Sequence, residues 1–262
     1  MHEFDVTVVN SYDGKADTLL VGLPGIGNVG LLFAKNLLRS TERKLLYRIH
    51  SKYISQYAIM LRNGLLRLPN NRIYSIKLKS KELLVLTGDL QVLTGQGQYV
   101  YNRKLFNFIT DELGVENIIT IGGYAHTDLL AYNEKSRSHS VYGNASNKYM
   151  LNTFKKLGVK FGDALTNITG SVGMLVSLAR INDTNGIALL GETGLNNPAD
   201  PIAAIDVSKI VSKYLKYDIK MDFLEDLHKK ILSVINKANT KINSTPTDYI
   251  DLSHYSKPDY IR

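Results

Sequence analysis

The chain has 262 residues, of which 44% are hydrophobic and 21% are charged, a composition typical of a globular protein. This length is sufficient for one large or two small domains with a substantial buried core. The net charge is +8, and the absence of cysteine excludes disulfides, thiolate zinc sites and a cysteine nucleophile.

The N-terminal residues 1–5 lack the basic start and the apolar core of a signal peptide. Apolar runs such as residues 118–121 and 187–190 are far shorter than the about 20 residues that span a bilayer. We therefore expect a cytoplasmic protein with no membrane partner.

The predicted elements alternate between strand and helix from residue 18 onward. Residues 18–23 predict a short buried strand, residues 28–39 a helix with one apolar face, and residues 44–49 a second strand. Asn63-Gly64 then predicts a tight hairpin between residues 57–62 and 65–68.

The middle of the chain continues in the same order. Residues 73–79 alternate apolar and polar side chains, which is typical of a strand with one face in water. Three later segments, residues 83–87, 117–121 and 187–190, predict buried inner strands. Residues 138–143 predict a further short strand. The predicted helices between and after them are residues 100–113, 146–157, 171–180 and 201–215. This order favours an α/β fold with a mainly parallel sheet and flanking helices.

The C-terminal part has a different character. Asp222 and Glu225 form a plausible capping box for a helix over residues 222–242. Its predicted buried face consists of Leu224, Leu227, Ile231, Ile235, Ala238 and Ile242. Residues 244–262 are rich in Ser, Thr, Pro, Asp and Tyr, which predicts a flexible tail. We therefore expect one domain over residues 1–243, followed by a tail.

Basic residues are concentrated between Lys35 and Lys81, where there are twelve Lys or Arg and one acidic residue, Glu42, giving +11. The rest of the chain is then slightly acidic, since +8 minus +11 is −3. Such a segment can contact nucleic acid, an acidic protein surface or solvent. No aromatic stacking motif accompanies it, so a solvated face is favoured and nucleic acid is not expected as a partner.

The segment from Gly25 to Gly30, which includes Gly27 and Asn28, fits G-x-G-x-x-G between a predicted strand and a predicted helix. That is the context of a dinucleotide fingerprint, which also needs an acidic residue about 20 positions further on. No Asp or Glu occurs between Glu42 and Glu82, so NAD is disfavoured and no cofactor is expected. A tight turn with close helix–sheet packing is favoured, while an anion site and an NADP site using Ser51 and Lys52 remain open.

Polar residues follow the predicted strand ends, where open parallel sheets bind their ligands. Together with the glycine turn they predict a pocket for an anion or small molecule, and its candidate residues are Gly25, Gly27, Asn28, Gly30, Asp89, Gln91, His126, Glu192 and Thr193. The alternative is that these side chains cap helices and satisfy loop backbones. The six histidines show no paired spacing, so no metal site is expected, and no catalytic residue is assigned.

Several segments taken together resemble the PAC2 (proteasome assembly chaperone 2) family, over about residues 17–215. They are residues 20–30, Gly-Asp-Leu-Gln at 88–91, Val-Tyr-Gly-Asn-Ala at 141–145, Leu-Leu-Gly-Glu-Thr at 189–193 and Asp-Pro-Ile-Ala-Ala at 200–204. The resemblance implies a phosphorylase/hydrolase-like α/β fold without an established catalytic role. Eukaryotic relatives assist assembly of the proteasome α ring, and archaeal relatives form homo-oligomers thought to act as similar chaperones.

The resemblance thus implies a non-catalytic, homo-oligomeric assembly chaperone or scaffold for proteasome α subunits. The alternative is an enzyme or ligand-binding protein that uses the strand-end pocket for a small molecule or nucleotide. Family docking through a C-terminal hydrophobic-Tyr-any tripeptide points to Tyr260, Ile261 and Arg262, but the tyrosine lies one position early. A docking tail and an uncommitted terminus therefore both remain open.

Overall fold

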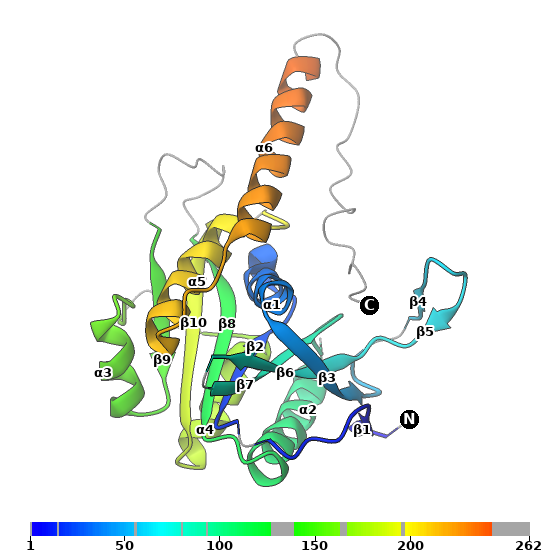
Figure 1. Cartoon of the computed structure of the whole chain (residues 1–262), viewed down its shortest axis with the longest axis vertical. Coiled ribbons are helices and arrows are strands. Elements are labelled where there is room, and N and C mark those ends of the chain that lie inside the picture. Colours follow the sequence, from blue (N-terminus) through cyan, green and yellow to red (C-terminus); the bar gives the residue numbers. More distant parts are fainter. Residues whose placement is uncertain are drawn as a thin grey trace.

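A computed structural model describes residues 2–14, 16–54, 57–79, 81–92, 94–126, 139–162, 167–194 and 197–242. These residues form an eight-stranded sheet in the order β1-β3-β6-β7-β2-β8-β10-β9 (Figure 1). Its strands are β1 (Asp5–Val8), β2 (Thr18–Gly22), β3 (Glu42–His50), β6 (Asn71–Leu78), β7 (Lys81–Gly88), β8 (Asn117–His126), β9 (Val141–Ala145) and β10 (Asn185–Gly194). A separate small hairpin pairs β4 (Ile59–Met60) with β5 (Leu66–Arg67).

The sheet is mixed, with the expected parallel arrangement at its centre. Strands β7, β2, β8 and β10 run parallel, whereas β1, β3, β6 and β9 pair antiparallel with their neighbours. For β6 and β7 the reason is the connection length, because only two residues separate these strands and a parallel crossover needs a dozen or more. The sequence did not predict β1, which is a four-residue edge strand.

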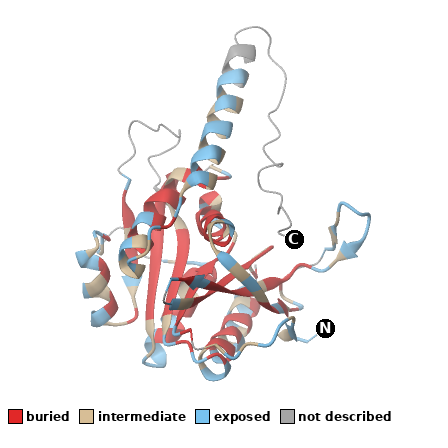
Figure 2. Ribbon diagram, in the orientation of Figure 1, coloured by how far each residue is buried: buried red, intermediate tan, exposed pale blue. Residues whose placement is uncertain are grey.

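Helices cover both faces of the sheet and give two large apolar cores. The helices are α1 (Val29–Ser40), α2 (Gly95–Asn107), α3 (Lys148–Lys156), α4 (Gly170–Ile181), α5 (Pro201–Leu215) and α6 (Asp222–Ile242). Helices α1, α3, α5 and the start of α6 pack on one face around residues such as Leu20 and Ile121. Helices α2 and α4 pack on the other, around residues such as Val21 and Ile118. Figure 2 shows the strands buried between these layers.

Several predicted boundaries were wrong. Strands β8 and β10 end at His126 and Gly194 rather than at residues 121 and 190, and β9 covers Val141–Ala145 rather than residues 138–143. Helix α2 begins at Gly95 rather than at residue 100, because the hydroxyl of Thr94 accepts a hydrogen bond from the Gly97 N–H and caps the helix despite its glycines. The chain then continues as a π-helix, η2 (Phe108–Glu112). The predicted hairpin forms, but its strands have only two residues each and its turn spans residues 61–65, with the Leu61 N–H bonded to the Leu65 carbonyl.

Helix α6 has the predicted bounds and projects beyond the layers (Figure 1). Leu224 is buried in the core, and Leu227 and Ile231 pack against it. Ile235 is only partly buried, because that part of the helix has left the body. The side chains of Ala238 and Ile242 lie outside the described residues, as does the predicted tail. Among the described residues no helix is both long and apolar enough to cross a membrane.

Candidate functional site

The glycine turn after β2 joins the sheet to α1 at very close range. A Cβ on Gly30 would lie 2.3 Å from the Ile121 carbonyl oxygen of β8, and a Cβ on Gly22 would lie 2.2 Å from the Gly30 oxygen. Gly27 has a φ of 57°, and a Cβ there would lie 2.7 Å from Thr193 Oγ1. Glycine is therefore required at position 27 by the backbone conformation and at position 30 by the close packing of α1 on β8. This agrees with the interpretation of the motif as a tight turn.

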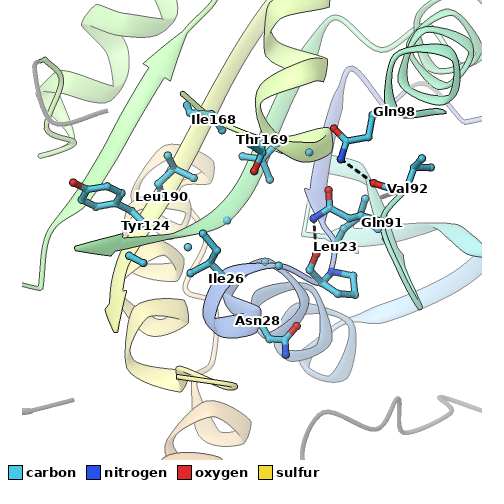
Figure 3. Close-up of a pocket in the computed structure, with 18 of the residues that line it drawn as sticks. Leu23, Ile26, Asn28, Gln91, Val92, Gln98, Tyr124, Ile168, Thr169 and Leu190 are labelled. Atoms are coloured by element: carbon cyan, nitrogen blue, oxygen red, sulfur yellow. Dashed lines mark hydrogen bonds between the residues drawn. The ribbon is translucent and has the colours of Figure 1, made fainter. Parts of the chain in front are cut away.

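A cavity of about 750 Å³ lies beside this turn, at the carboxyl ends of the central strands (Figure 3). Four of the predicted pocket residues line it, and they are Gly25, Asn28, Gly30 and Gln91. Figure 3 shows Tyr124 and Leu190 on one side and Gln91 and Gln98 on the other, with Ile26 between them. The structure thus has a cavity at the strand ends, and four of the nine predicted residues line it.

Gln91 organises this cavity by joining two of its walls. Its side-chain amide donates to the Pro24 carbonyl in the glycine turn, and its oxygen accepts a 2.9 Å hydrogen bond from the Ser171 N–H at the start of α4. Gln98 is held similarly, since its amide donates to the Val92 carbonyl at 2.8 Å. The carboxamide of Gln91 is thus committed to the architecture of the cavity rather than presented freely to a ligand.

The walls of the cavity are apolar or carry neutral polar groups. The apolar side chains include Leu23, Ile26, Leu90, Ile168 and Leu190. No charged side chain is present among the described residues that line it. Such a space can bind a small neutral or amphipathic molecule, but its described residues hold no carboxylate or imidazole for proton transfer.

Asp89 does not line the cavity, and its carboxylate is fully used elsewhere. Arg67 donates to it with both guanidinium nitrogens, at 2.7 and 2.9 Å, Arg72 donates at 2.9 Å, and the Asn70 N–H donates at 3.0 Å. Its side chain is 1% exposed. Burial raises the pKa of this carboxyl, but the hydrogen bonds and charges of Arg67 and Arg72 outweigh it, so that the pKa is lowered. At neutral pH Asp89 is therefore an anion that joins β5 to the main sheet.

The other predicted residues lie behind the cavity or outside the described side chains. Glu192 and Thr193 are consecutive buried residues of β10 and do not line the cavity. The Glu192 N–H donates to the Ser140 carbonyl at 3.1 Å, whereas Thr193 Oγ1 is packed toward Gly27 and has no hydrogen-bond partner in the described part of the chain. His126 ends β8, and its side chain is not described. The described side chains at these positions bring no acid–base pair together.

Sequence reasoning missed the wall contributed by Ile168 and Thr169, which immediately precede α4. The clue in the sequence was Gly170, a glycine just before a predicted helix. Its φ of 78° lets the chain turn into α4 next to the side chain of Gln91. It also missed Tyr124, which packs edge-on against Tyr142 with ring centroids 5.1 Å apart. Among the described residues, no group of three or more His, Asp or Glu is arranged to hold a metal.

Comparisons with known proteins agree over nearly the whole chain. A protein of Methanocaldococcus jannaschii described as uncharacterized is 27% identical over 219 residues, which cover 84% of this chain and 81% of the relative. The structure of Pyrococcus furiosus PbaB, described as an archaeal proteasome activator, gives a TM-score of 0.81 at 26% identity and covers 91% of this chain and 100% of that chain.

A second solved structure is Pyrococcus furiosus PbaA, described as an archaeal homolog of proteasome-assembly chaperone. It gives a TM-score of 0.73 at 21% identity, covers 91% of this chain and 93% of that chain, and supports the fold alone. The sequence model of the PAC2 family matches residues 19–239, which run from β2 into the distal part of α6. Because this match spans most of the chain, including every strand around the cavity, the chain belongs to the PAC2 family.

Proposed function

We propose that this protein is a non-catalytic, homo-oligomeric assembly chaperone or scaffold whose clients are proteasome α subunits. The observation that carries the proposal is the PAC2 match over residues 19–239. It is supported by the similarity to PbaB, described as an archaeal proteasome activator, and by the fold shared with PbaA, described as a homolog of proteasome-assembly chaperone.

The geometry of the strand ends is consistent with a non-catalytic role. If the protein were an enzyme, Asp89 would be a candidate acid or base. Its carboxylate is instead paired with Arg67 and Arg72, and it does not line the cavity. Glu192 is buried in β10. Turnover of a nucleoside, nucleotide or acyl substrate that is lost in Asp89→Ala or Glu192→Ala would overturn the non-catalytic proposal.

The test of the client is a pull-down of purified proteasome α subunits with the full-length protein and with a protein that ends at Ser244. Binding by both proteins would place the client surface on the folded domain. Binding by the full-length protein alone would place it in the tail. Absence of binding by either protein would overturn the proposed client.

The last residues, Tyr260, Ile261 and Arg262, are the proposed docking element within the tail. Tyr260→Ala in the full-length protein should abolish any binding that depends on the tail, because the ring and the terminal carboxylate would enter one client pocket together. Tyr255→Ala is the matched control, since it removes the same side chain five positions earlier. Equal losses in both variants would contradict docking through the final three residues.

A second candidate function is binding of a small molecule, and the cavity of about 750 Å³ favours it. A ligand present at 100 times its dissociation constant stabilises the folded state by about 2.7 kcal/mol. A thermal-shift screen against nucleosides, nucleotides and neutral amphiphiles would detect this as a rise in melting temperature. A hit that is lost in Leu190→Phe, which would narrow the cavity with a larger ring, would establish ligand binding there. No shift with any of these compounds would dismiss it.

A further inference from the structure

The hairpin formed by β4 and β5, together with its flanks, projects from the body and is called here the arm (residues 57–68). Met60 of β4 pairs with Leu66 of β5, so both side chains lie on one face of the hairpin, and Leu68 continues that face. These three apolar side chains are 75%, 68% and 45% exposed, respectively. Figures 1 and 2 show the arm standing away from the sheet with an exposed tip.

The arm is held in place at its base. Arg67 lies on the opposite face of β5 from Leu66 and forms the bidentate ion pair with the buried Asp89. An isolated two-stranded hairpin is at best marginally stable in water, and this ion pair fixes the arm to the main sheet. The chain thus presents an apolar face at a defined position, which is the signature of an interaction surface rather than of a loose loop.

A complementary groove of about 620 Å³ lies at the sheet edge, between β1 and the end of α2. Phe4, Val6 and Val8 line it from the sheet side, and Phe108 lines it from the helical side. Exposed acidic residues, Asp111 and Glu112, also line it. Among the described residues β1 pairs only with β3, so the outer edge of β1 is open to a further strand.

The arm and the groove match in charge as well as in polarity. The chain has no acidic residue between Glu42 and Glu82, and the turn of the arm carries the exposed Arg62, whereas Arg67 is taken up by Asp89 at the base. The groove combines apolar walls with Asp111 and Glu112. Lys104 also lines it, but its ammonium lies 3.5 Å from the carboxylate of Glu3, so the two acidic residues leave the groove negatively charged. We propose that the arm of one copy of this chain docks in the β1 groove of a second copy, with its apolar face on the groove and Arg62 toward Asp111 and Glu112.

Such a contact joins two different surfaces and is therefore heterologous, so that each copy can offer an arm to one neighbour and a groove to another. Strand addition at the open edge of β1 would bring alternate arm side chains toward Val6 and Val8. The inference rests on the proposed homo-oligomer and adds the surfaces that build it. It is independent of the client.

The test compares self-association of full-length variants by sedimentation equilibrium over a range of concentrations. Met60→Ser with Leu66→Ser removes the apolar face of the arm, and Asp111→Lys with Glu112→Lys reverses the acidic charge of the groove. Each double variant should weaken self-association by at least about tenfold. Tyr149→Ser, which removes an exposed aromatic from α3, is the matched control and should leave association unchanged.

Mixing the two double variants gives the decisive result. The arm variant keeps an intact groove and the groove variant keeps an intact arm, so together they should form a one-to-one heterodimer that cannot grow further. All four substituted residues are exposed, so circular dichroism should show wild-type folding. Failure of the mixture to form a heterodimer would overturn the proposed contact.

The remaining outcomes separate this inference from the proposed function. A wild-type protein that stays monomeric would overturn both the homo-oligomer and the contact. A wild-type oligomer that persists in both double variants would overturn the contact alone. Loss of association in the arm variant but not in the groove variant would also overturn it, because a contact between two arms would then be the better explanation.

Discussion

At the scale of single residues, the carboxylate of Asp89, just after the end of β7, has a structural role rather than a catalytic one. Its two oxygens accept from Arg67, Arg72 and the Asn70 N–H, and these donors come from three different places in the chain: β5, β6 and the connection between them. Removing the carboxylate leaves two guanidinium groups close together without an anion. That loss is costly because the site is shielded from water.

Asp89→Asn should therefore lower the free energy of unfolding at pH 7 by about 3 kcal/mol. Urea denaturation monitored by circular dichroism measures this change. The control is Asp226→Asn, which removes an exposed carboxylate from α6 that lies 4.0 Å from Lys229 and should leave stability unchanged. Similar losses in both variants would contradict the role assigned to Asp89.

The same residue gives a pH dependence of defined sign. The pKa of Asp89 is lowered in the folded state, so its contribution is fully present above the unfolded-state pKa of about 3.9 and disappears as the pH falls through the folded-state value. The difference in unfolding free energy between the wild type and Asp89→Asn should be constant from pH 5 to 8 and shrink below about pH 4. A difference that grows on acidification would contradict this assignment.

At the scale of elements, α1 lies unusually close to the sheet because glycine replaces a side chain at the contact. A methyl group on Gly30 would meet the Ile121 carbonyl of β8, which is backbone and cannot rotate away. The helix would have to shift, and the whole glycine turn with it. Backbone conformation and helix–sheet packing thus account for Gly27 and Gly30 of the G-x-G-x-x-G pattern.

Gly30→Ala should accordingly destabilise the protein by about 1–3 kcal/mol. The matched control is Gly95→Ala in the first turn of α2, where an added Cβ would meet nothing within 4 Å and better helix propensity should raise stability slightly. Thermal unfolding of both variants measures the contrast. A melting temperature that is unchanged in Gly30→Ala would show that α1 can move without cost.

At the scale of the whole molecule, residues 1–243 are proposed to form one domain that folds without the tail. The two apolar cores draw on elements from the N-terminal strand to the start of α6, and Leu224 is the most distal residue buried in them. The PAC2 match also ends within α6, at residue 239. The tail should therefore add reach for a partner rather than stability.

A protein ending at Asn243 should keep the melting temperature of the full chain to within about one degree, since each 1 kcal/mol corresponds to roughly 2–4 °C for a domain of this size. Differential scanning calorimetry at equal concentration provides the measurement. A clear fall in melting temperature would place the tail against the body and would contradict the single-domain division.

The amino-acid sequence by itself determined the elements that local patterns specify. The continuous apolar runs predicted the inner strands, residues 201–215 were predicted as the helix that forms α5, and the pattern from Asp222 predicted the bounds of α6. These succeed because capping, period and apolar length act over a few residues. The four-residue strand β1 was missed because so short an element depends on its pairing with β3.

Tertiary structure decided which strand-end residues meet. Gly25, Asn28, Gly30 and Gln91 line one cavity, whereas Asp89 turns to Arg67 and Arg72 and Glu192 is buried in β10. The sequence contains all of these side chains but not the direction in which each points. That direction depends on partners far away in the chain. Gln91 accepts from the Ser171 N–H, 80 residues away, and Asn28 donates to the Pro198 carbonyl, 170 residues away. Such contacts exist only after the sheet and its helices have packed.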